Sequence, residues 1–336
     1  MSRTGIEEKP EWRTVPSEIR TRVGETLGSP VARAMRIWGG YGPSPTYRLR
    51  LENGKRAFLK GIFPGSNEFQ IKAHDSELRV YRELHEYITP WAPGLLGEFT
   101  HDQWRIILLE DLGPKTAPPW RKSDVKAAAR GLAEFHAKTI NIDNAKLAEN
   151  LRFSGILNTQ LWKSDITDET INSLASIAGP QSVEAARWLN ENSHILAEAA
   201  GRLIDIADSM VLMHLDVRSD NLRVNSGRLR MFDWPHATIG PPEFELAAFA
   251  QSVEAEDGSP AEYVLNSYEE KAKLNPEVLI SSVVSISGYF ANQSWQPDIP
   301  GLPRLRTFQR QQLSASLRWA SRLLELEPPT WLSANP

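Results

Sequence analysis

The sequence changes character near residue 110, and this change constrains the fold more than any other feature. The first third contains strand-like runs such as Thr46 to Glu52 and Arg56 to Ile62, joined by Asn53-Gly54, which favours a two-residue hairpin turn. Most of the remaining chain has helical spacing. A β-rich first third followed by a helical remainder predicts an α+β protein with two unequal lobes.

The expected elements follow from apolar spacing and from turn residues. In the first third we expect a short helix closed by Gly28, two further strands, and one helix whose apolar residues recur at three-and-four spacing. Beyond residue 114 we expect a helix capped by Ser123-Asp124, a turn-and-strand block, and later helices. The ranges are Pro16 to Leu27, Leu78 to Ile88, Leu95 to Thr100, Arg105 to Leu109, Ser123 to His136, Val211 to Trp234, Phe244 to Val253 and Gln309 to Leu326.

Composition excludes several classes of protein. The chain has 336 residues, 38 Lys and Arg against 42 Asp and Glu, and no cysteine. The lack of cysteine excludes disulfides, thiolate metal sites and cysteine nucleophiles, and the near-neutral charge gives no basic field for nucleic acid. The most apolar stretch, Val278 to Ala291, is too short for a bilayer and is interrupted by serines, so we expect a buried helix. No secretory signal is recognisable at the N-terminus. A cytoplasmic enzyme or binding protein is the class that remains.

The segment from Met213 to Trp234 is the most informative. His214, Asp216 and Asn221 form the pattern His-x-Asp-x-x-x-x-Asn, and Asp233 follows a short hairpin. Phosphoryl transfer needs such a set, because one carboxylate orients or deprotonates the attacking hydroxyl while an amide oxygen and a second carboxylate hold a divalent metal. Mg²⁺ prefers oxygen ligands of this kind. The alternative is a loop whose polar side chains only cap backbone groups.

These motifs resemble the aminoglycoside phosphotransferase and choline kinase-like family, small-molecule kinases with a bilobal protein-kinase-like fold. The similarity rests on residues 214–221 and on Phe-Asp-Trp at residues 232–234, which is similar to the kinase Asp-Phe-Gly. It implies that Asp216 is the catalytic base and that Asn221 and Asp233 bind the metal. Residues 240–247 are similar to the next segment of the family, but Glu245 stands where relatives usually carry Asp.

The first third fits the same template. Residues 38–44, with Gly40 and Ser44, lie where the phosphate-covering loop is expected, although a plain hairpin turn is equally consistent with the local sequence. Lys60 lies near the end of a strand, where kinases place the lysine that contacts the phosphates. For its carboxylate partner we choose Glu77, which resembles the Glu of the family's Glu-x-x-x-Tyr pattern; Glu68 and Glu83 are rivals.

The change of character near residue 110 coincides with a candidate hinge. Residues 108–112 look like the hinge between the lobes, where the backbone groups of Glu110 and Leu112 would bind adenine; an ordinary strand end is the alternative. We therefore expect residues 1–111 to form the N-terminal nucleotide-binding lobe. Residues 112–336 would form the C-terminal helical lobe, with the catalytic loop 214–221 and the acceptor site.

Other polar residues receive secondary roles. We predict that Arg218 supplies positive charge to the transition state, although it could equally pair with Asp220 or Glu245. His214 is expected to support the loop through hydrogen bonds, and His136 to pack against the core. For the acceptor site, the acidic residues at positions 254, 256 and 257 and Trp295 are candidates, with solvated charges and simple packing as the alternatives.

The resemblance implies phosphorylation of a hydroxyl on a small molecule, with ATP (or GTP) and Mg²⁺. The acceptor would be aminoglycoside-like, an amino sugar or another metabolite, and neither nucleic acid nor membrane is expected as a partner. A regulatory pseudokinase is one alternative, but the motif residues are intact. A protein kinase is another, but Phe244 follows Trp234 within ten residues, which leaves no room for an activation segment.

Overall fold

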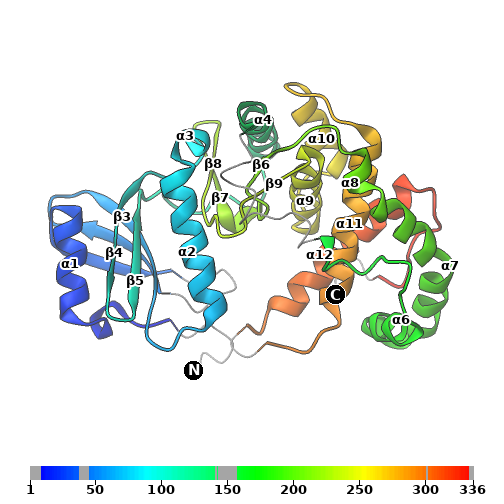
Figure 1. Cartoon of the computed structure of the whole chain (residues 1–336), viewed down its shortest axis with the longest axis horizontal. Helices are drawn as coiled ribbons and strands as arrows, with labels where there is room; N and C mark the ends of the chain where they lie inside the picture. The colour runs from blue at the N-terminus through cyan, green and yellow to red at the C-terminus, as the bar shows by residue number, and fades with distance from the viewer. Residues whose placement is uncertain (1–8, 38–44, 141, 143–156, 300–301, 333–336) are drawn as a thin grey trace.

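A five-stranded antiparallel sheet with the order β1-β2-β3-β5-β4 forms the centre of the N-terminal lobe (Figure 1). The computed structural model describes residues 9–37, 45–140, 142, 157–299 and 302–332. The elements of this lobe are η1 (Trp12–Thr14), α1 (Ser17–Leu27), β1 (Val31–Arg36), β2 (Thr46–Leu51), β3 (Arg56–Ile62), α2 (Glu68–Glu83), α3 (His85–Ile88), β4 (Leu95–His101) and β5 (Trp104–Leu109).

The two faces of the sheet have different partners because side chains alternate along each strand. Leu59 points to the face covered by α1, where it is buried in one cluster with Ile19 and Val23. Phe58 and Lys60 therefore point to the opposite face, on which α2 lies (Figure 1). This alternation places Lys60 on the side of the sheet that faces the rest of the protein.

The predicted hairpin between β2 and β3 is confirmed, although its turn is longer than the two residues expected. The strands stop at Leu51 and resume at Arg56. Gly54 has a φ of 83°, a left-handed conformation that glycine adopts without steric cost. The Asn53 side chain accepts a hydrogen bond from the Lys55 N–H at 3.0 Å, so the Asn-Gly pair still directs the turn.

Helices dominate the C-terminal lobe, and in its described residues four short strands form two small ladders, β6 with β9 and β7 with β8. The elements are α4 (Lys122–Thr139), α6 (Asp168–Ala175), η2 (Ser176–Gln181), α7 (Ser182–Gly201), α8 (Leu203–Ile206), β6 (Val211–Met213), η3 (Ser219–Asn221), β7 (Leu222–Asn225), β8 (Arg228–Met231), β9 (Thr238–Gly240), α9 (Pro242–Ala255), α10 (Ala261–Glu269), α11 (Pro276–Ser294) and α12 (Leu305–Leu323). The α+β, two-lobe fold expected from the sequence is confirmed.

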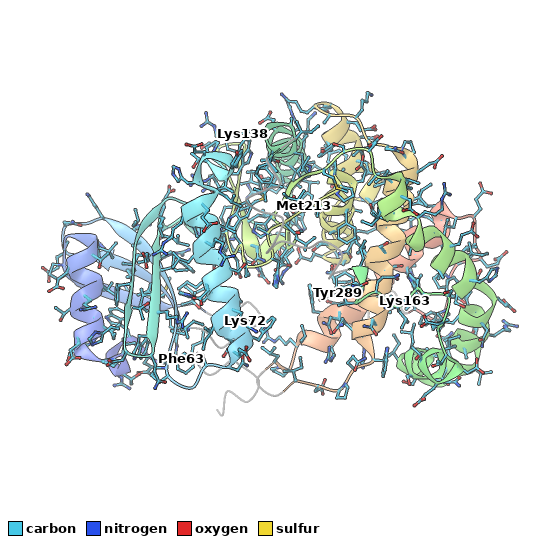
Figure 2. The ribbon with its side chains drawn as sticks, in the orientation of Figure 1. Phe63, Lys72, Lys138, Lys163, Met213 and Tyr289 are labelled. Carbon is cyan, nitrogen blue, oxygen red and sulfur yellow. The ribbon has the colours of Figure 1, made fainter. Side chains whose placement is uncertain are left out.

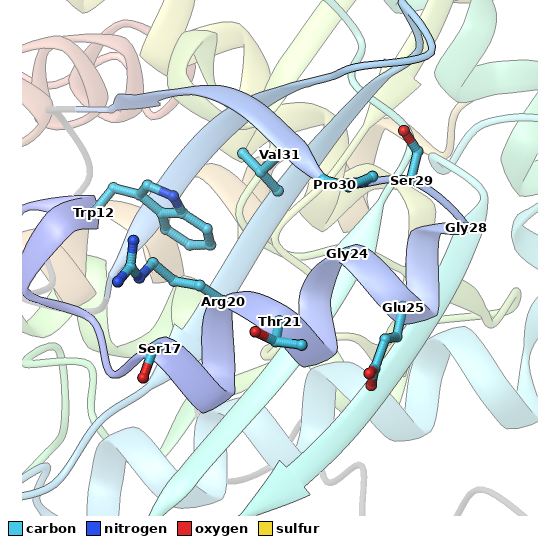
Figure 3. Close-up of a pocket in the computed structure, with 10 residues that line it drawn as sticks. All are labelled: Trp12, Ser17, Arg20, Thr21, Gly24, Glu25, Gly28, Ser29, Pro30 and Val31. Atoms are coloured by element: carbon cyan, nitrogen blue, oxygen red, sulfur yellow. The ribbon is translucent and has the colours of Figure 1, made fainter.

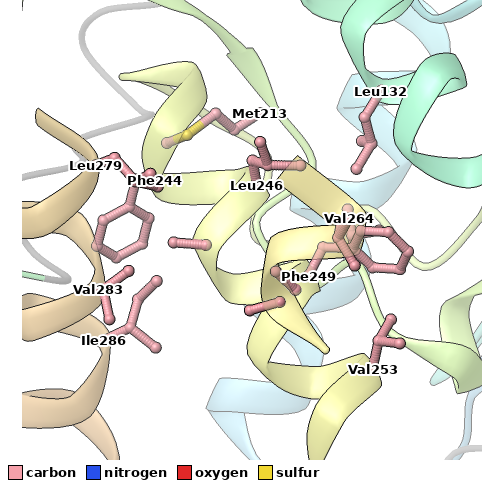
Figure 4. Close-up of a cluster of buried hydrophobic side chains, with 14 of the residues drawn as sticks. Leu132, Met213, Phe244, Leu246, Phe249, Val253, Val264, Leu279, Val283 and Ile286 are labelled. Atoms are coloured by element: carbon pink, nitrogen blue, oxygen red, sulfur yellow. The ribbon is translucent and has the colours of Figure 1, made fainter. Parts of the chain in front are cut away.

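Helix α9 is the centre of the large hydrophobic core. Its apolar side chains contact α4, β6, α10 and α11, as Figure 4 shows for Phe244, Leu246, Phe249 and Val253. The packing around α9 fixes the end of β6, which leads directly into residue 214. The position of the predicted catalytic loop thus depends on this core.

Two expectations about helices have different outcomes. The buried helix near residues 278–291 is confirmed as α11, and its Ser285 hydroxyl donates to the Ser281 carbonyl at 2.8 Å, so this buried serine finds its partner within the helix. None of the described helices is long and apolar enough to cross a membrane.

The predicted Ser123-Asp124 cap is wrong. Helix α4 begins at Lys122, and its N-cap residue, Arg121, makes no capping bond through its side chain.

The contact between α4 and β8 gives a stability prediction. A Cβ added to Gly131 in α4 would lie 2.5 Å from the Cβ of Leu229, an atom fixed to the backbone. Alanine normally favours a helix over glycine by about 1 kcal/mol. Here we expect Gly131→Ala to lower the free energy of unfolding by about 1–3 kcal/mol, measured by urea denaturation, because the added methyl overpacks the interface.

Gly201 provides the matched control, because it ends α7, is exposed, and has nothing within 4 Å of an added Cβ. Gly201→Ala should leave the free energy of unfolding unchanged or raise it slightly. A Gly131→Ala protein as stable as the parent would show that α4 and β8 are not packed this closely.

Candidate active site

The loop that follows β6 carries the motif from His214 to Asn221, and we call residues 214–221 the catalytic loop. Its geometry is set by hydrogen bonds within the loop. The Asn221 side-chain amide donates to Asp216 twice, at 3.0 Å to the carbonyl oxygen and at 2.6 Å to carboxylate oxygen Oδ2. Arg218 donates from Nε to the other carboxylate oxygen of Asp216 at 2.9 Å. The Asp216 carboxylate is therefore held from both sides and has one orientation.

His214 supports this loop and is fully buried. Its Nε2 donates to the carbonyl of Phe232 at 3.0 Å, and its Nδ1 accepts from the Asp216 N–H at 3.2 Å. Burial lowers the pKa of His214, in agreement with a neutral ring that donates from one nitrogen and accepts at the other. The contacts agree with the supporting role expected from the sequence.

A buried chain of polar groups lies behind the loop. Glu245 of α9 accepts a hydrogen bond from the Leu215 N–H at 2.5 Å, and its second oxygen lies 2.8 Å from Nε2 of His136. The other nitrogen of His136 lies 2.9 Å from the hydroxyl of Tyr268. Leu215 has a φ of 70°, an unfavourable conformation for leucine, and the bond to Glu245 fixes its N–H there. Glu245, in the place where relatives usually carry Asp, thus contacts the loop backbone.

Lys60 connects the two lobes. Its ammonium nitrogen lies 2.5 Å from Oε2 of Glu77 in α2 and also forms an ion pair with Asp233 of the C-terminal lobe. The two rivals of Glu77 pair elsewhere, Glu68 with Lys72 and Glu83 with Arg79. The structure therefore brings together three residues that lie far apart in the sequence.

The ion pairs shift the pKa values of all three groups. Burial alone would lower the pKa of Lys60, but Asp233 and Glu77 outweigh it and raise the pKa above the ordinary lysine value. Burial raises the pKa of Glu77. Burial opposes the ionised form of Asp233, yet Lys60 outweighs it and lowers the pKa of Asp233. Lys60 is thus a permanent cation, and Asp233 a permanent anion, at neutral pH.

Asp233 and Asn221 lie on adjoining segments. The Phe232 N–H donates to the Asn221 carbonyl at 2.9 Å, which places the start of the Phe-Asp-Trp segment against the end of the catalytic loop. Asp233 has a φ of 70°, the second left-handed non-glycine residue at this site. Because the Asn221 amide nitrogen is bonded to Asp216, the amide oxygen is the atom left to bind a ligand.

The described part of the chain contains no cluster of three or more His, Cys, Asp or Glu side chains that could hold a metal. Asn221 and Asp233 together offer an amide oxygen and a carboxylate. Such a set fits Mg²⁺, which commonly takes one or two carboxylates from the protein and completes its shell with phosphate oxygens and water.

The predicted hinge follows β5 directly. Two contacts fix the Glu110 side chain: it accepts from the Gly94 N–H at 3.2 Å and pairs with Arg230 at 2.6 Å. The Leu112 carbonyl accepts from the side chain of Asn225 at 3.0 Å. Within the described residues no hydrogen bond uses the Glu110 carbonyl or the Leu112 N–H, the two backbone groups that a nucleobase could bind. The phosphate-loop residues Gly40 and Ser44 lie outside the described residues.

Of the predicted acidic acceptor residues, Glu256 already has protein partners. One carboxylate oxygen accepts from the Ser219 hydroxyl at 2.6 Å and the other from Trp120 at 2.8 Å. Glu254 accepts from the Ala261 N–H at 3.1 Å. Glu256 therefore fixes the catalytic loop at Ser219, a role that sequence spacing did not suggest.

Two aromatic residues near the loop were missed. The Arg218 guanidinium lies 5.2 Å from the centre of the Phe308 ring in α12. Tyr289 lies on α11 (Figure 2), and its pKa is raised by burial and by the Asp216 carboxylate. Aromatic residues on helices are usually packing residues, so no local signal distinguished these two. Trp295, the candidate proposed from sequence, is partly buried and packs against the large hydrophobic core.

A surface pocket of about 560 Å³ lies elsewhere, between α1 and the start of β1 (Figure 3). Trp12, Arg20 and Val31 are among its lining residues. It lies beside the helix that covers the face of the sheet opposite Lys60. This pocket is separate from the site formed by Lys60, Asp216 and Asp233.

Solved structures with the same fold agree with this architecture. A spectinomycin phosphotransferase in complex with ADP and spectinomycin is 16% identical, covers 90% of this chain and 98% of its own, and has a TM-score of 0.56. An aminoglycoside phosphotransferase from Alicyclobacillus acidocaldarius is 11% identical, with 88% and 92% covered and a TM-score of 0.62. A macrolide 2'-phosphotransferase from Brachybacterium faecium is 17% identical, with 93% and 99% covered and a TM-score of 0.51.

Sequence comparison identifies the family more directly. Curated protein sequences give no match. The profile of the phosphotransferase enzyme family, however, matches residues 33–277, well over half of the chain, including Lys60, Glu77, the catalytic loop and Asp233. The chain belongs to the phosphotransferase enzyme family and is a kinase-type phosphotransferase with a protein-kinase-like fold.

Proposed function

We propose that the protein transfers the γ-phosphoryl group of ATP to a hydroxyl of a small molecule. The observation that carries the proposal is the convergence of Lys60, Asp233 and the pair Asp216–Asn221 at one place between the lobes. A cation, two carboxylates and an amide in this arrangement provide the positioning and charge that phosphoryl transfer requires.

The nucleotide would bind along the N-terminal lobe. Lys60 would contact its phosphates, with Glu77 holding the ammonium group in place, and Gly40 and Ser44 belong to the loop proposed to cover them. The Glu110 carbonyl and the Leu112 N–H would bind the base. The spectinomycin phosphotransferase with this fold was solved with ADP, which supports a nucleotide as the phosphoryl donor. An assay with GTP beside ATP tests which base is accepted.

Asn221 and Asp233 would hold Mg²⁺, since their oxygens suit a hard cation. When bound, the ion would neutralise charge on the β- and γ-phosphates. The ion pair between Lys60 and Asp233 supports this assignment, because it places the carboxylate beside the side chain that we propose to contact the phosphates.

Asp216 would accept the proton of the acceptor hydroxyl. As the hydroxyl oxygen bonds to the γ-phosphorus, the bond from that phosphorus to the bridging oxygen breaks, ADP leaves, and the proton passes to the carboxylate of Asp216. Asn221 fixes the orientation of this carboxylate, and Glu245 fixes the preceding backbone. His214 has both ring nitrogens engaged and takes no part in the proton transfer.

The acceptor would bind on the C-terminal lobe beside Asp216, near Tyr289 and Phe308. We retain an aminoglycoside-like compound, an amino sugar or another metabolite as candidates, because the spectinomycin and macrolide phosphotransferases share this fold and act on small molecules. A cytoplasmic location, where ATP is available, goes with this proposal. A panel of hydroxyl compounds, with ADP release as the readout, would identify the acceptor.

Asp216→Asn tests the proposed base. The amide cannot accept the proton, so we expect the turnover number with the best acceptor to fall about 10²- to 10⁴-fold, while the dissociation constant of ADP stays near the parental value. Asp205→Asn, the same change at an exposed position of α8, serves as the control and should keep full activity. Parental turnover in Asp216→Asn would refute this assignment. A parent protein that binds ADP but phosphorylates no acceptor would favour the pseudokinase alternative.

Arg218→Ala tests charge stabilisation in the transition state. Arg218 contacts Asp216 and also Asp220, at 3.2 Å, so it could act only by holding the loop. Lys115 also forms an ion pair with Asp220. Lys115→Ala removes a contact that holds the loop but leaves Arg218 in place, so it separates loop-holding from charge stabilisation. We expect Arg218→Ala to lower turnover about 10²- to 10³-fold with little change in the Michaelis constant for ATP. Lys115→Ala should lower it less than tenfold, and equal losses in the two variants would argue for a loop-holding role.

A further inference from the structure

The end of α11 and the start of α12 lie together beside the catalytic loop, and we call residues 286–294 and 305–312 of these helices the acceptor wall. Arg218, which donates to Asp216 at 2.9 Å, lies with its guanidinium 5.2 Å from the centre of the Phe308 ring in α12. The Phe308 ring in turn lies 6.5 Å from the ring of Phe290 in α11. An acceptor bound beside Asp216 would therefore contact the side chains of this wall.

Tyr289 contributes a phenol hydroxyl to the acceptor wall (Figure 2). Its side chain is partly exposed, and no described residue forms a hydrogen bond with its hydroxyl. Burial, and then the charge of Asp216, raise the pKa of Tyr289, whereas the charges of Arg218 and Arg306 lower it. The hydroxyl is therefore protonated at neutral pH and can donate to a ligand. Asp216 is itself paired with Arg218, so the charge of Arg306 is the one that remains to be balanced.

Arg306 is a buried cation whose partners are all neutral. The residue is only 7% exposed. Its guanidinium donates to the carbonyls of Pro297 and Gln293, at 2.6 Å and 3.1 Å, and to the amide oxygen of Gln309 at 2.7 Å. Carbonyl groups at the C-terminal end of α11 attract a cation, but no carboxylate of a described residue pairs with this one. The acceptor wall therefore carries a positive charge that no acid balances.

The acids that a cationic acceptor would need are not part of the acceptor wall. Residues 286–294 and 305–312 are all described and contain no Asp or Glu, and the single acid of α11, Glu277, lies in its first turn and pairs with Arg202. Asp298, in the connection between the two helices, is exposed. Glu254 and Glu256, two of the acids considered from the sequence, are bonded to the protein instead. The wall thus has an excess of positive charge.

We propose that the acceptor is a hydroxyl compound that carries an acidic group, such as a hydroxy carboxylic acid, and that the acceptor wall disfavours compounds with ammonium groups. This inference rests on the proposed function, because it narrows the acceptor of the same reaction. A carboxylate would be attracted by the charge of Arg306 and would accept a hydrogen bond from Tyr289. An ammonium group would lie near the same charge without an acid to pair with.

The first experiment compares acceptors that differ only in charge. Glucuronate, glucose and the glucose derivative with an amine at the same carbon form one series, and glycerate, glycerol and aminopropanediol form a second. ADP release with ATP and Mg²⁺ gives kcat/KM for each compound. We expect the acid of a series to exceed the amine by about tenfold or more, the effect of one unbalanced charge near a protein surface. A parent protein that uses the amines as well as the acids, or that uses no acid, overturns the inference.

Gln293→Glu tests the charge of the wall directly. Gln293 lies one turn after Tyr289 on the same side of α11, and its carbonyl accepts from Arg306, so a carboxylate of the same shape would balance that charge. We expect the ratio of kcat/KM for acid over amine to fall about tenfold, while the dissociation constant of ADP stays parental. Gln181→Glu, the same change at an exposed position before α7, is the matched control and should keep the parental ratio.

Tyr289→Phe removes the hydroxyl without changing the ring, and it carries the test if Gln293→Glu does not fold. It should raise the Michaelis constant for the acid about tenfold, because a hydrogen bond to a charged group is lost, and should change that for the uncharged compound less. The dissociation constant of ADP should again stay parental. An unchanged preference for the acid in both variants would show that the wall does not select the acceptor.

Hydrolysis of ATP, with water as the acceptor, separates this inference from the function beneath it. A parent protein that hydrolyses ATP with Mg²⁺ but prefers the amines keeps the proposed function and loses this inference. A parent protein that neither binds ADP nor hydrolyses ATP loses both.

Discussion

The ion pairs of Lys60 are the interaction on which the rest of the site depends. Lys60 belongs to the sheet of the N-terminal lobe, Glu77 to a helix packed on that sheet, and Asp233 to the C-terminal lobe. One ammonium group therefore sets the distance between the lobes at the proposed site. Burial makes the contacts sensitive to loss of a partner, because removing one charge would leave the others buried and uncompensated. The relative position of the lobes and the chemistry of the site are thus linked through one residue.

The catalytic loop is rigid for a different reason. Its backbone is bonded to Glu245 through Leu215, and Glu245 is bonded to His136, which is bonded to Tyr268. All three supporting side chains are buried in the helical core. The left-handed Leu215 costs conformational energy, and the buried network holds it there. A site built on such a support loses little entropy when a substrate binds, because its groups are already oriented.

The sequence predicted those parts of the site that are adjacent in the chain. The spacing of Asp216, Asn221 and Asp233 was enough to predict that they lie close together, because only one loop and one short hairpin connect them. Glu77 could be chosen over its rivals only through family resemblance, because the direction in which a helical carboxylate points depends on tertiary packing. Glu256 was singled out as an acceptor residue, but its contact with Ser219 was not foreseen, because that contact joins segments more than thirty residues apart. The start of α4 was missed for a local reason, because its N-cap residue, Arg121, makes no capping bond through its side chain.

The charged side chains at the site form ion pairs with one another, so a charged ligand can bind only by replacing these pairs with new ones. Lys60 pairs with Glu77 and Asp233, and Arg218 with Asp216 and Asp220. A nucleotide with its metal ion would bring both signs of charge, so it can exchange these pairs for new ones without leaving a bare charge in the interior. Free phosphate brings only negative charge and would have to separate Lys60 from Asp233 without offering the carboxylate a new partner. The arrangement therefore favours a metal-bound polyphosphate over a simple anion.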